Sequence, residues 1–129
     1  MPTKDIEVET VRSTRLADEM ALEKLNYLKD STYIQRGEIK KFYVELSYIL
    51  REYVENSVYI KTLEMTTEEI KLYRSEIPFD RDQLGIWMDI LQRADLSKYA
   101  KSDPDKMICH EDLSAGETFV KNTVAFWKV

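Results

Sequence analysis

Residues 38–70 read EIKKFYVELSYILREYVENSVYIKTLEMTTEEI, and this stretch decides the predicted fold. Its first half places apolar side chains three and four residues apart, which is the spacing of one helix face. The residues on that face are Ile39, Phe42, Tyr43, Leu46, Ile49, Leu50 and Tyr53. The pattern predicts a central core helix over about 38–54. The alternative is that its tyrosines line a ligand groove.

The second half of the stretch predicts a short strand and then a helix start. Residues 58–63 are rich in β-branched and aromatic side chains and are too few for another helix. Thr66 is followed three residues later by Glu69, the spacing of a capping box, and apolar residues flank the pair as in a hydrophobic staple. We expect a strand at 58–63 and a helix at about 67–76.

The same combination recurs at Asp80 and Gln83, again with flanking apolar residues. It predicts a helix at about 81–94, and Pro78 ends the helix before it. Gly85 lies inside this second helix, where a glycine costs about 1 kcal/mol relative to alanine. Close packing against a neighbouring element would explain its presence there.

The rest of the chain adds two helices and a second extended segment. Residues 1–14 form a flexible leader or linker, and an apolar strip then predicts a first helix at about 15–30. Residues 96–100 suggest an extended segment, followed by a polar turn at 102–105. Helical spacing predicts a last helix at about 111–126.

Composition limits the classes of function. The chain has 129 residues, of which 43% are hydrophobic and 33% charged, as in a single globular domain. Its net charge of −5 argues against broad nucleic-acid binding and against adsorption to an anionic bilayer. Cys109 is the only cysteine, so no internal disulfide can form, and no apolar run is long enough to span a bilayer. We expect this fragment to be soluble and to suit a reducing compartment.

The sequence contains no recognisable catalytic, cofactor or metal site. Cys109-His110-Glu111-Asp112 has the residue types of metal ligands, but four adjacent side chains cannot easily converge on one ion. We expect a turn at a helix start there. Three acidic pairs lie at predicted helix starts or turns, where the helix dipole stabilises them. These pairs are Glu68/Glu69, Asp80/Asp82 and Asp103/Asp105. We predict that the chain is not an enzyme and holds no cofactor or metal.

The order of the predicted elements resembles a winged helix. A helix–turn–helix at 66–94 follows the central helix and the strand, and an extended segment comes after it. We therefore expect one mainly α domain, 15–129, of about five helices, with a winged-helix-like core and the option of a small two-stranded wing. This order makes a winged-helix DNA-binding transcriptional regulator the alternative function.

The side chains exposed on the second helix of this pair do not favour that alternative. DNA readers present Arg, Lys, Asn or Gln to the groove, whereas positive and negative side chains balance here. The exposed set is Arg81, Asp82, Asp89, Gln92 and Arg93. The lysines that follow and could touch phosphate groups are Lys98, Lys101 and Lys106.

Three blocks of sequence, in this order, resemble one known family. They are LSYILREYV at 46–54, LEMTTEEI at 63–70 and LQRADLSKYAK at 91–101. The pattern is similar to the cytoplasmic C-terminal region of BatD-like membrane proteins, which accompany the aerotolerance operons of Bacteroidetes and related bacteria. The resemblance covers about 15–123. Tyr99 stands where this family more often has Phe, and no transmembrane helix precedes residue 15.

The resemblance implies a non-catalytic interaction or regulatory domain with protein partners at the inner membrane, in a stress or aerotolerance complex. In the full-length protein it would lie on the cytoplasmic side, tethered only through a helix upstream of residue 1. Four polar residues of the three blocks have no evident structural role. We hypothesise that some of them pair and fix the strand-like segments against the central helix. These residues are Arg51, Glu64, Asp95 and Lys98.

Overall fold

The computed structural model describes residues 17–99 and 104–128, and within them lie five α-helices and three short 3₁₀ turns. The α-helices are α2 (Ala17–Asp30), α3 (Ile39–Val58), α4 (Thr67–Tyr73), α5 (Arg81–Tyr99) and α6 (Lys106–Thr123). The 3₁₀ turns are η1 (Thr62–Glu64), η2 (Arg74–Glu76) and η3 (Val124–Phe126). The prediction of a mainly α fold is confirmed.

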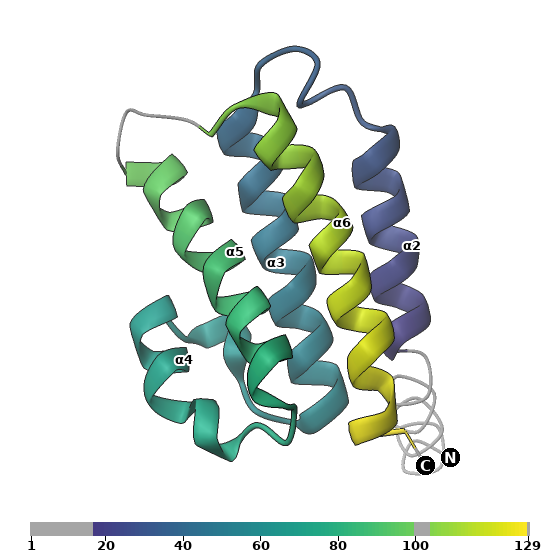
Figure 1. Cartoon of the computed structure of the whole chain (residues 1–129), viewed down its shortest axis with the longest axis vertical. Helices are drawn as coiled ribbons and strands as arrows, with labels where there is room; N and C mark the ends of the chain where they lie inside the picture. The colour runs from purple at the N-terminus through teal and green to yellow at the C-terminus, as the bar shows by residue number, and fades with distance from the viewer. Residues whose placement is uncertain (1–16, 100–103, 129) are drawn as a thin grey trace, which may run out of the picture.

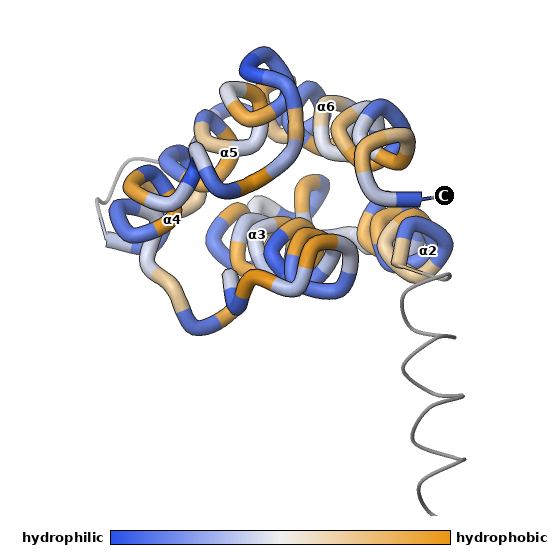
Figure 2. The backbone as a smooth tube through the Cα atoms, turned by 90° about the horizontal axis from the view of Figure 1, so that it is seen from below, coloured by the Kyte–Doolittle hydropathy of each residue, from blue (hydrophilic) through white to orange (hydrophobic). Residues whose placement is uncertain are grey.

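The four long helices form an antiparallel bundle, with the short helix α4 at its side (Figure 1). α2 packs on α3, α3 on α5, α5 on α6, and α6 returns to α2. Figure 2 looks along these helices and shows α3 facing α5 and α6, with α4 beside α5. The chain runs up, down, up and down through α2, α3, α5 and α6, and α4 is inserted in the connection between α3 and α5.

α3 is the central helix, and its predicted apolar face is confirmed. All seven residues of that face are buried, including both of its tyrosines, so the tyrosines belong to the core rather than to a ligand groove. The helix continues to Val58, about one turn beyond the predicted end, and buries Val54 and Ser57 on the same side. Tyr59 then ends it with a left-handed backbone, φ 62°.

A buried hydrogen-bond network joins three of the long helices. The carboxylate of Asp112 on α6 accepts a hydrogen bond from the Tyr43 hydroxyl of α3 at 2.6 Å. The same carboxylate accepts two hydrogen bonds from the Arg93 guanidinium of α5, at 2.7 and 2.9 Å. Asp112 is only 3% exposed, so these three bonds replace the water that its charge loses on folding.

A second network and an aromatic cluster close the opposite end of the bundle. The Tyr53 hydroxyl shares a 2.7 Å hydrogen bond with the Thr123 hydroxyl and accepts another, also of 2.7 Å, from the indole N–H of Trp127. The ring of Trp87 stacks on Phe119 with centroids 5.7 Å apart. Both tyrosines of the central face therefore place a hydroxyl in the core and give it a partner there.

The predicted strands and wing are wrong, because the described residues contain no strand. Residues 58–63 finish α3 and enter η1, where the Thr62 hydroxyl donates to the Arg51 carbonyl oxygen at 2.6 Å. Residues 96–99 continue α5, while Ala100 lies outside the described part. Ile90, Ala94 and Ser97 form one buried helix face, but small side chains at two of these positions weakened its apolar pattern. The winged-helix-like core is accordingly an antiparallel bundle.

The outer boundaries also differ from the prediction. α6 begins at Lys106 rather than near 111, because the Asp105 carboxylate accepts a hydrogen bond from the Ile108 N–H at 2.9 Å and caps the helix. Helical structure after α4 shifts to the 3₁₀ turn η2 at Arg74. The predicted leader, 1–14, and the first half of the predicted turn at 102–105 lie outside the described residues.

We predict that stability falls when the pH rises above about 10, the usual pKa of tyrosine. Burial raises the pKa of Tyr43, with the Asp112 hydrogen bond adding to the effect, and burial also raises the pKa of Tyr53. Because the folded-state pKa exceeds the unfolded one, this contribution is complete below the unfolded pKa and is lost as the pH rises through the folded pKa. Urea unfolding at a series of alkaline pH values measures the loss.

Phenylalanine variants identify the groups responsible for this loss. Tyr43→Phe should reduce the alkaline decline in the free energy of unfolding, whereas Tyr27→Phe, at an exposed position, should leave it unchanged. The same decline in all three proteins would contradict the assignment to Tyr43.

Candidate functional site

Capping hydrogen bonds mark where α4 and α5 begin. The Thr66 hydroxyl accepts a hydrogen bond from the Glu69 N–H at 3.2 Å, and the Glu69 carboxylate accepts one from the Thr66 N–H at 3.2 Å. This confirms the first predicted capping box. Asp80 caps α5 by accepting a hydrogen bond from the Gln83 N–H at 2.9 Å. The second box is only half formed, since the Gln83 side-chain oxygen is buried without a hydrogen-bond partner.

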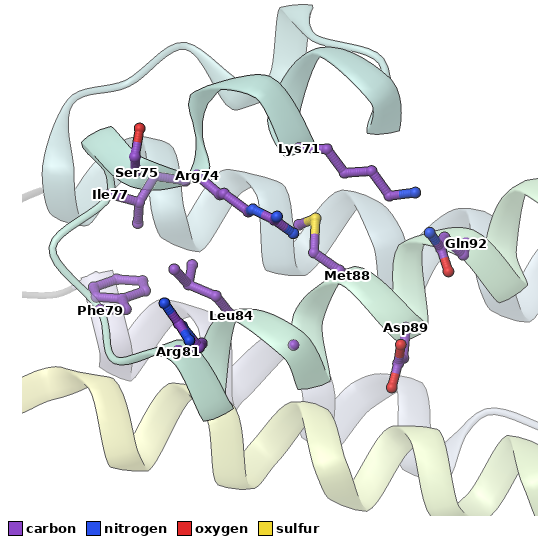
Figure 3. A pocket seen from close by; sticks show the side chains of 11 residues that line it. Lys71, Arg74, Ser75, Ile77, Phe79, Arg81, Leu84, Met88, Asp89 and Gln92 are labelled. Atoms are coloured by element: carbon purple, nitrogen blue, oxygen red, sulfur yellow. The ribbon is translucent and has the colours of Figure 1, made fainter.

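A groove of about 820 Å³ lies between α4 and α5, and we call it the α4–α5 groove (Figure 3). Three basic residues line it: Lys71 and Arg74 from the side of α4 and η2, and Arg81 from α5. In Figure 3, Lys71 of α4 and Arg74 of η2 extend into the space between these elements and α5. The apolar lining residues are Ile77, Phe79, Leu84 and Met88, and the others are Ser75, Gly85, Asp89 and Gln92.

Gly85 is an exposed residue that borders open space in this groove. A Cβ atom at Gly85 would meet no heavy atom within 4 Å, so the expectation that close packing requires this glycine is wrong. Gly116 on α6 is the closely packed glycine, because a Cβ there would lie 3.4 Å from the Leu46 side chain of α3. Gly85 thus carries the helix cost of glycine without a packing reason for it, at a position that lines the groove.

The groove is locally basic in an acidic protein. Arg74 and Arg81 form no ion pair or hydrogen bond with any described residue, while Lys71 lies 3.5 Å from Glu68. Among the residues that the structure describes, Asp89 is the only acidic one that lines the groove. It also contributes to the raised pKa of Arg93, although the hydrogen bonds to Asp112 are the main cause of that shift. Two guanidinium groups therefore remain available to an incoming anion.

The four polar residues singled out from the sequence blocks do come together. Arg51, Glu64, Asp95 and Lys98 all line one smaller pocket of about 260 Å³ between α3, η1 and α5, which we call the Arg51 pocket. The Arg51 guanidinium donates to the Thr67 hydroxyl at 3.2 Å. Burial lowers its pKa, and the negative charge of Asp95 partly opposes that effect.

The hypothesis that some of these four residues pair with one another is not met, although all four line one pocket. No ion pair joins any two of these four described residues, and the strands they were expected to fix are absent from this part of the chain. The Nε atom of Arg51 is buried without a partner. Arg51 instead ties α3 to the first residue of α4 through Thr67, and so helps to hold α4 beside the bundle.

The Cys109–Asp112 segment lies inside α6 and not at a helix start. Cys109 and Asp112 face the core, while His110 and Glu111 are exposed, so the four side chains diverge. Within residues 17–99 and 104–128, no group of three His, Cys, Asp or Glu residues is placed to hold a metal ion. Asp112 serves the buried network with Tyr43 and Arg93.

The residues considered for DNA contact do not all lie on one surface. Arg93 is bound to Asp112, Lys98 lines the Arg51 pocket, and Lys106 donates to the Gln35 carbonyl oxygen at 3.0 Å. Lys101 and Asp103 lie outside the described residues. Asp82 does not line the α4–α5 groove, whereas Arg81, Asp89 and Gln92 do.

Comparison with protein-family models, with curated proteins and with solved structures gives no match. The resemblance to BatD-like proteins therefore stays a prediction. No helix among the described residues is long and apolar enough to cross a membrane.

Sequence reasoning missed the basic part of the groove. Lys71 and Arg74 lie three residues apart at the end of α4, and Arg81 begins α5, but nothing in their spacing predicts that they share one groove. The available signal was Gly85, a glycine in the middle of a helix with no evident turn to make.

Two glycine substitutions should change stability in opposite directions. Gly85→Ala should raise the free energy of unfolding by about 0.5–1 kcal/mol, because it improves helix propensity and meets no neighbour. Gly116→Leu should lower it by about 1–3 kcal/mol, because the added side chain overpacks the contact between α6 and α3. Urea unfolding followed by circular dichroism measures both changes. A lower free energy of unfolding in Gly85→Ala would mean that the added methyl group meets a neighbouring side chain, which would contradict an open groove at this position.

Proposed function

We propose that this chain is a non-catalytic protein-interaction domain and that a segment of a partner protein docks in the α4–α5 groove. The observation that carries the proposal is Gly85, which borders open space on α5. Arg74 and Arg81 line the same groove and form no ion pair with a described residue. A purely structural helix would gain stability from any other helix-forming residue at this position. A glycine that lowers helix stability but borders an open groove is typical of a binding surface.

The buried polar groups form hydrogen bonds within the core, which supports a non-catalytic role. The described titratable side chains with shifted pKa values are Tyr43, Arg51, Tyr53 and Arg93. The hydroxyl groups of Tyr43 and Tyr53 and the guanidinium group of Arg93 form hydrogen bonds to α6. Burial and these hydrogen bonds therefore account for their shifted pKa values without a catalytic role. None of these four residues lines the α4–α5 groove.

The resemblance to BatD-like proteins adds a location to this proposal. On that reading the domain is tethered on the cytoplasmic side of a bacterial inner membrane, within a stress or aerotolerance complex. A membrane-spanning segment encoded directly upstream of residue 1 would support the tether. The DNA-binding alternative has lost the wing that motivated it, since no strand occurs in the described part of the chain.

Selection from a displayed library of random linear peptides tests the docking groove. Peptides that bind the wild-type chain should lose binding to Gly85→Phe, in which a ring occupies the groove, and should keep binding to Lys40→Phe. Lys40 is exposed on α3 and does not line the groove, so this control adds the same ring elsewhere. Melting temperatures of both variants confirm that they fold, and Gly85→Leu replaces Gly85→Phe if the latter does not.

The result that supports the proposal is a set of peptides that discriminates between the two phenylalanine variants. Peptides that bind Gly85→Phe as well as they bind the wild-type chain would place the interaction surface elsewhere. A selection that yields no specific peptide would contradict a peptide-docking function for the groove.

A further inference from the structure

We infer that the segment which docks in the α4–α5 groove is acidic and carries an apolar anchor side chain. This inference rests on the proposed function and names the chemistry of the partner. The anchor would lie over Gly85 and Met88, and flanking carboxylates would pair with Arg74 and Arg81.

The charge distribution favours an acidic partner. The whole chain has a net charge of −5, yet the groove brings together Lys71, Arg74 and Arg81 against the single carboxylate of Asp89. A partner guided to this surface by electrostatic attraction must therefore be locally negative, although most of the domain repels negative charge. Such attraction mainly raises the rate and specificity of association and weakens with added salt.

The two arginines supply groups that can bind carboxylates. Arg74 comes from η2 and Arg81 from the first turn of α5, so cationic groups enter the groove from both of the elements that line it (Figure 3). Neither guanidinium has a partner among the described residues. A guanidinium group matches the two oxygens of a carboxylate and forms paired hydrogen bonds with it.

The apolar lining gives a complementary surface for an apolar anchor beside the acidic groups, although its four side chains are themselves largely buried. Leu84 and Met88 face the groove from α5, and Phe79 and Ile77 complete the apolar lining next to Gly85. A methionine adapts its shape to different apolar side chains. A nucleic-acid backbone offers phosphates but no apolar anchor for this lining, and the chain's net charge of −5 disfavours a long polyanion. An acidic peptide with a leucine, isoleucine or phenylalanine anchor satisfies both parts of the groove.

The composition of the selected peptides tests this inference separately from the proposed function. Peptides whose binding is lost in Gly85→Phe should be enriched in Asp and Glu around an apolar residue. Gly85-dependent peptides that are neutral or basic would overturn the inference and leave the docking groove standing. The absence of Gly85-dependent peptides would overturn the proposed function itself.

A charge exchange then tests the two arginines directly. The tightest acidic peptide, labelled for fluorescence anisotropy, should bind the Arg74→Glu/Arg81→Glu double variant about tenfold or more weakly, since two exposed ion pairs are replaced by repulsion. The same peptide with its acids changed to lysine should bind the double variant more tightly than it binds the wild-type chain. Equal binding of the acidic peptide to both proteins would overturn the role of the arginines. The exposed pair Lys29→Glu/Lys40→Glu, outside the groove, controls for net charge.

Two further measurements assign the groove to another occupant if the inference is wrong. A gel shift of duplex DNA at low salt that disappears in Gly85→Phe would show a nucleic-acid ligand. A dimer in sedimentation velocity that Gly85→Phe dissociates would show a second copy of the chain. Either result would overturn the inference that an acidic peptide segment occupies the groove. The inference is supported if neither result is found and the Gly85-dependent peptides are acidic.

Discussion

The buried carboxylate of Asp112 is the constraint on which the rest of the bundle depends. A carboxylate that is 3% exposed would cost several kcal/mol to bury alone, so α3, α5 and α6 must bring Tyr43 and Arg93 to it at hydrogen-bonding distance. A shift of any of these helices along its axis would break one of the bonds. The network therefore fixes the axial position and rotation of α5, and with them the side of α5 that is presented to α4.

The α4–α5 groove follows from this placement and is separate from the core that creates it. α4 has seven residues and packs mainly on α5, whereas each long helix packs on at least two others. Thr66 and Glu69 cap α4, Ile70 anchors it in the core, and Arg51 holds its first residue. An element with so few buried contacts opens more readily than the bundle. The groove is thus lined on one side by a helix of the bundle and on the other by a less firmly packed helix, a common arrangement for binding sites.

The predictable features of the fold were those that local sequence determines. The apolar face of α3 and the capping box at Thr66 depend on residues within a few positions of one another, and both were found correctly. The end of α5 was missed because Ala94 and Ser97 are too small to give a strong apolar signal. Residues 58–63 resembled a strand because they are rich in β-branched and aromatic side chains. The groove itself could not be predicted, since only folding brings Lys71 and Arg74 near Arg81. Gly85 was recognised as anomalous from the sequence, but its cause required the structure.

The central claim is that the groove binds a partner segment while the core stays as it is, and amide hydrogen exchange tests it most directly. Exchange is compared for the chain alone and with the tightest acidic peptide from the selection. The account predicts slower exchange in α4, η2 and the first half of α5 on binding, with the amides of α2 and of the centre of α3 unchanged. Protection confined to the α2–α3 side, or no change around α4 at saturating peptide, would contradict it.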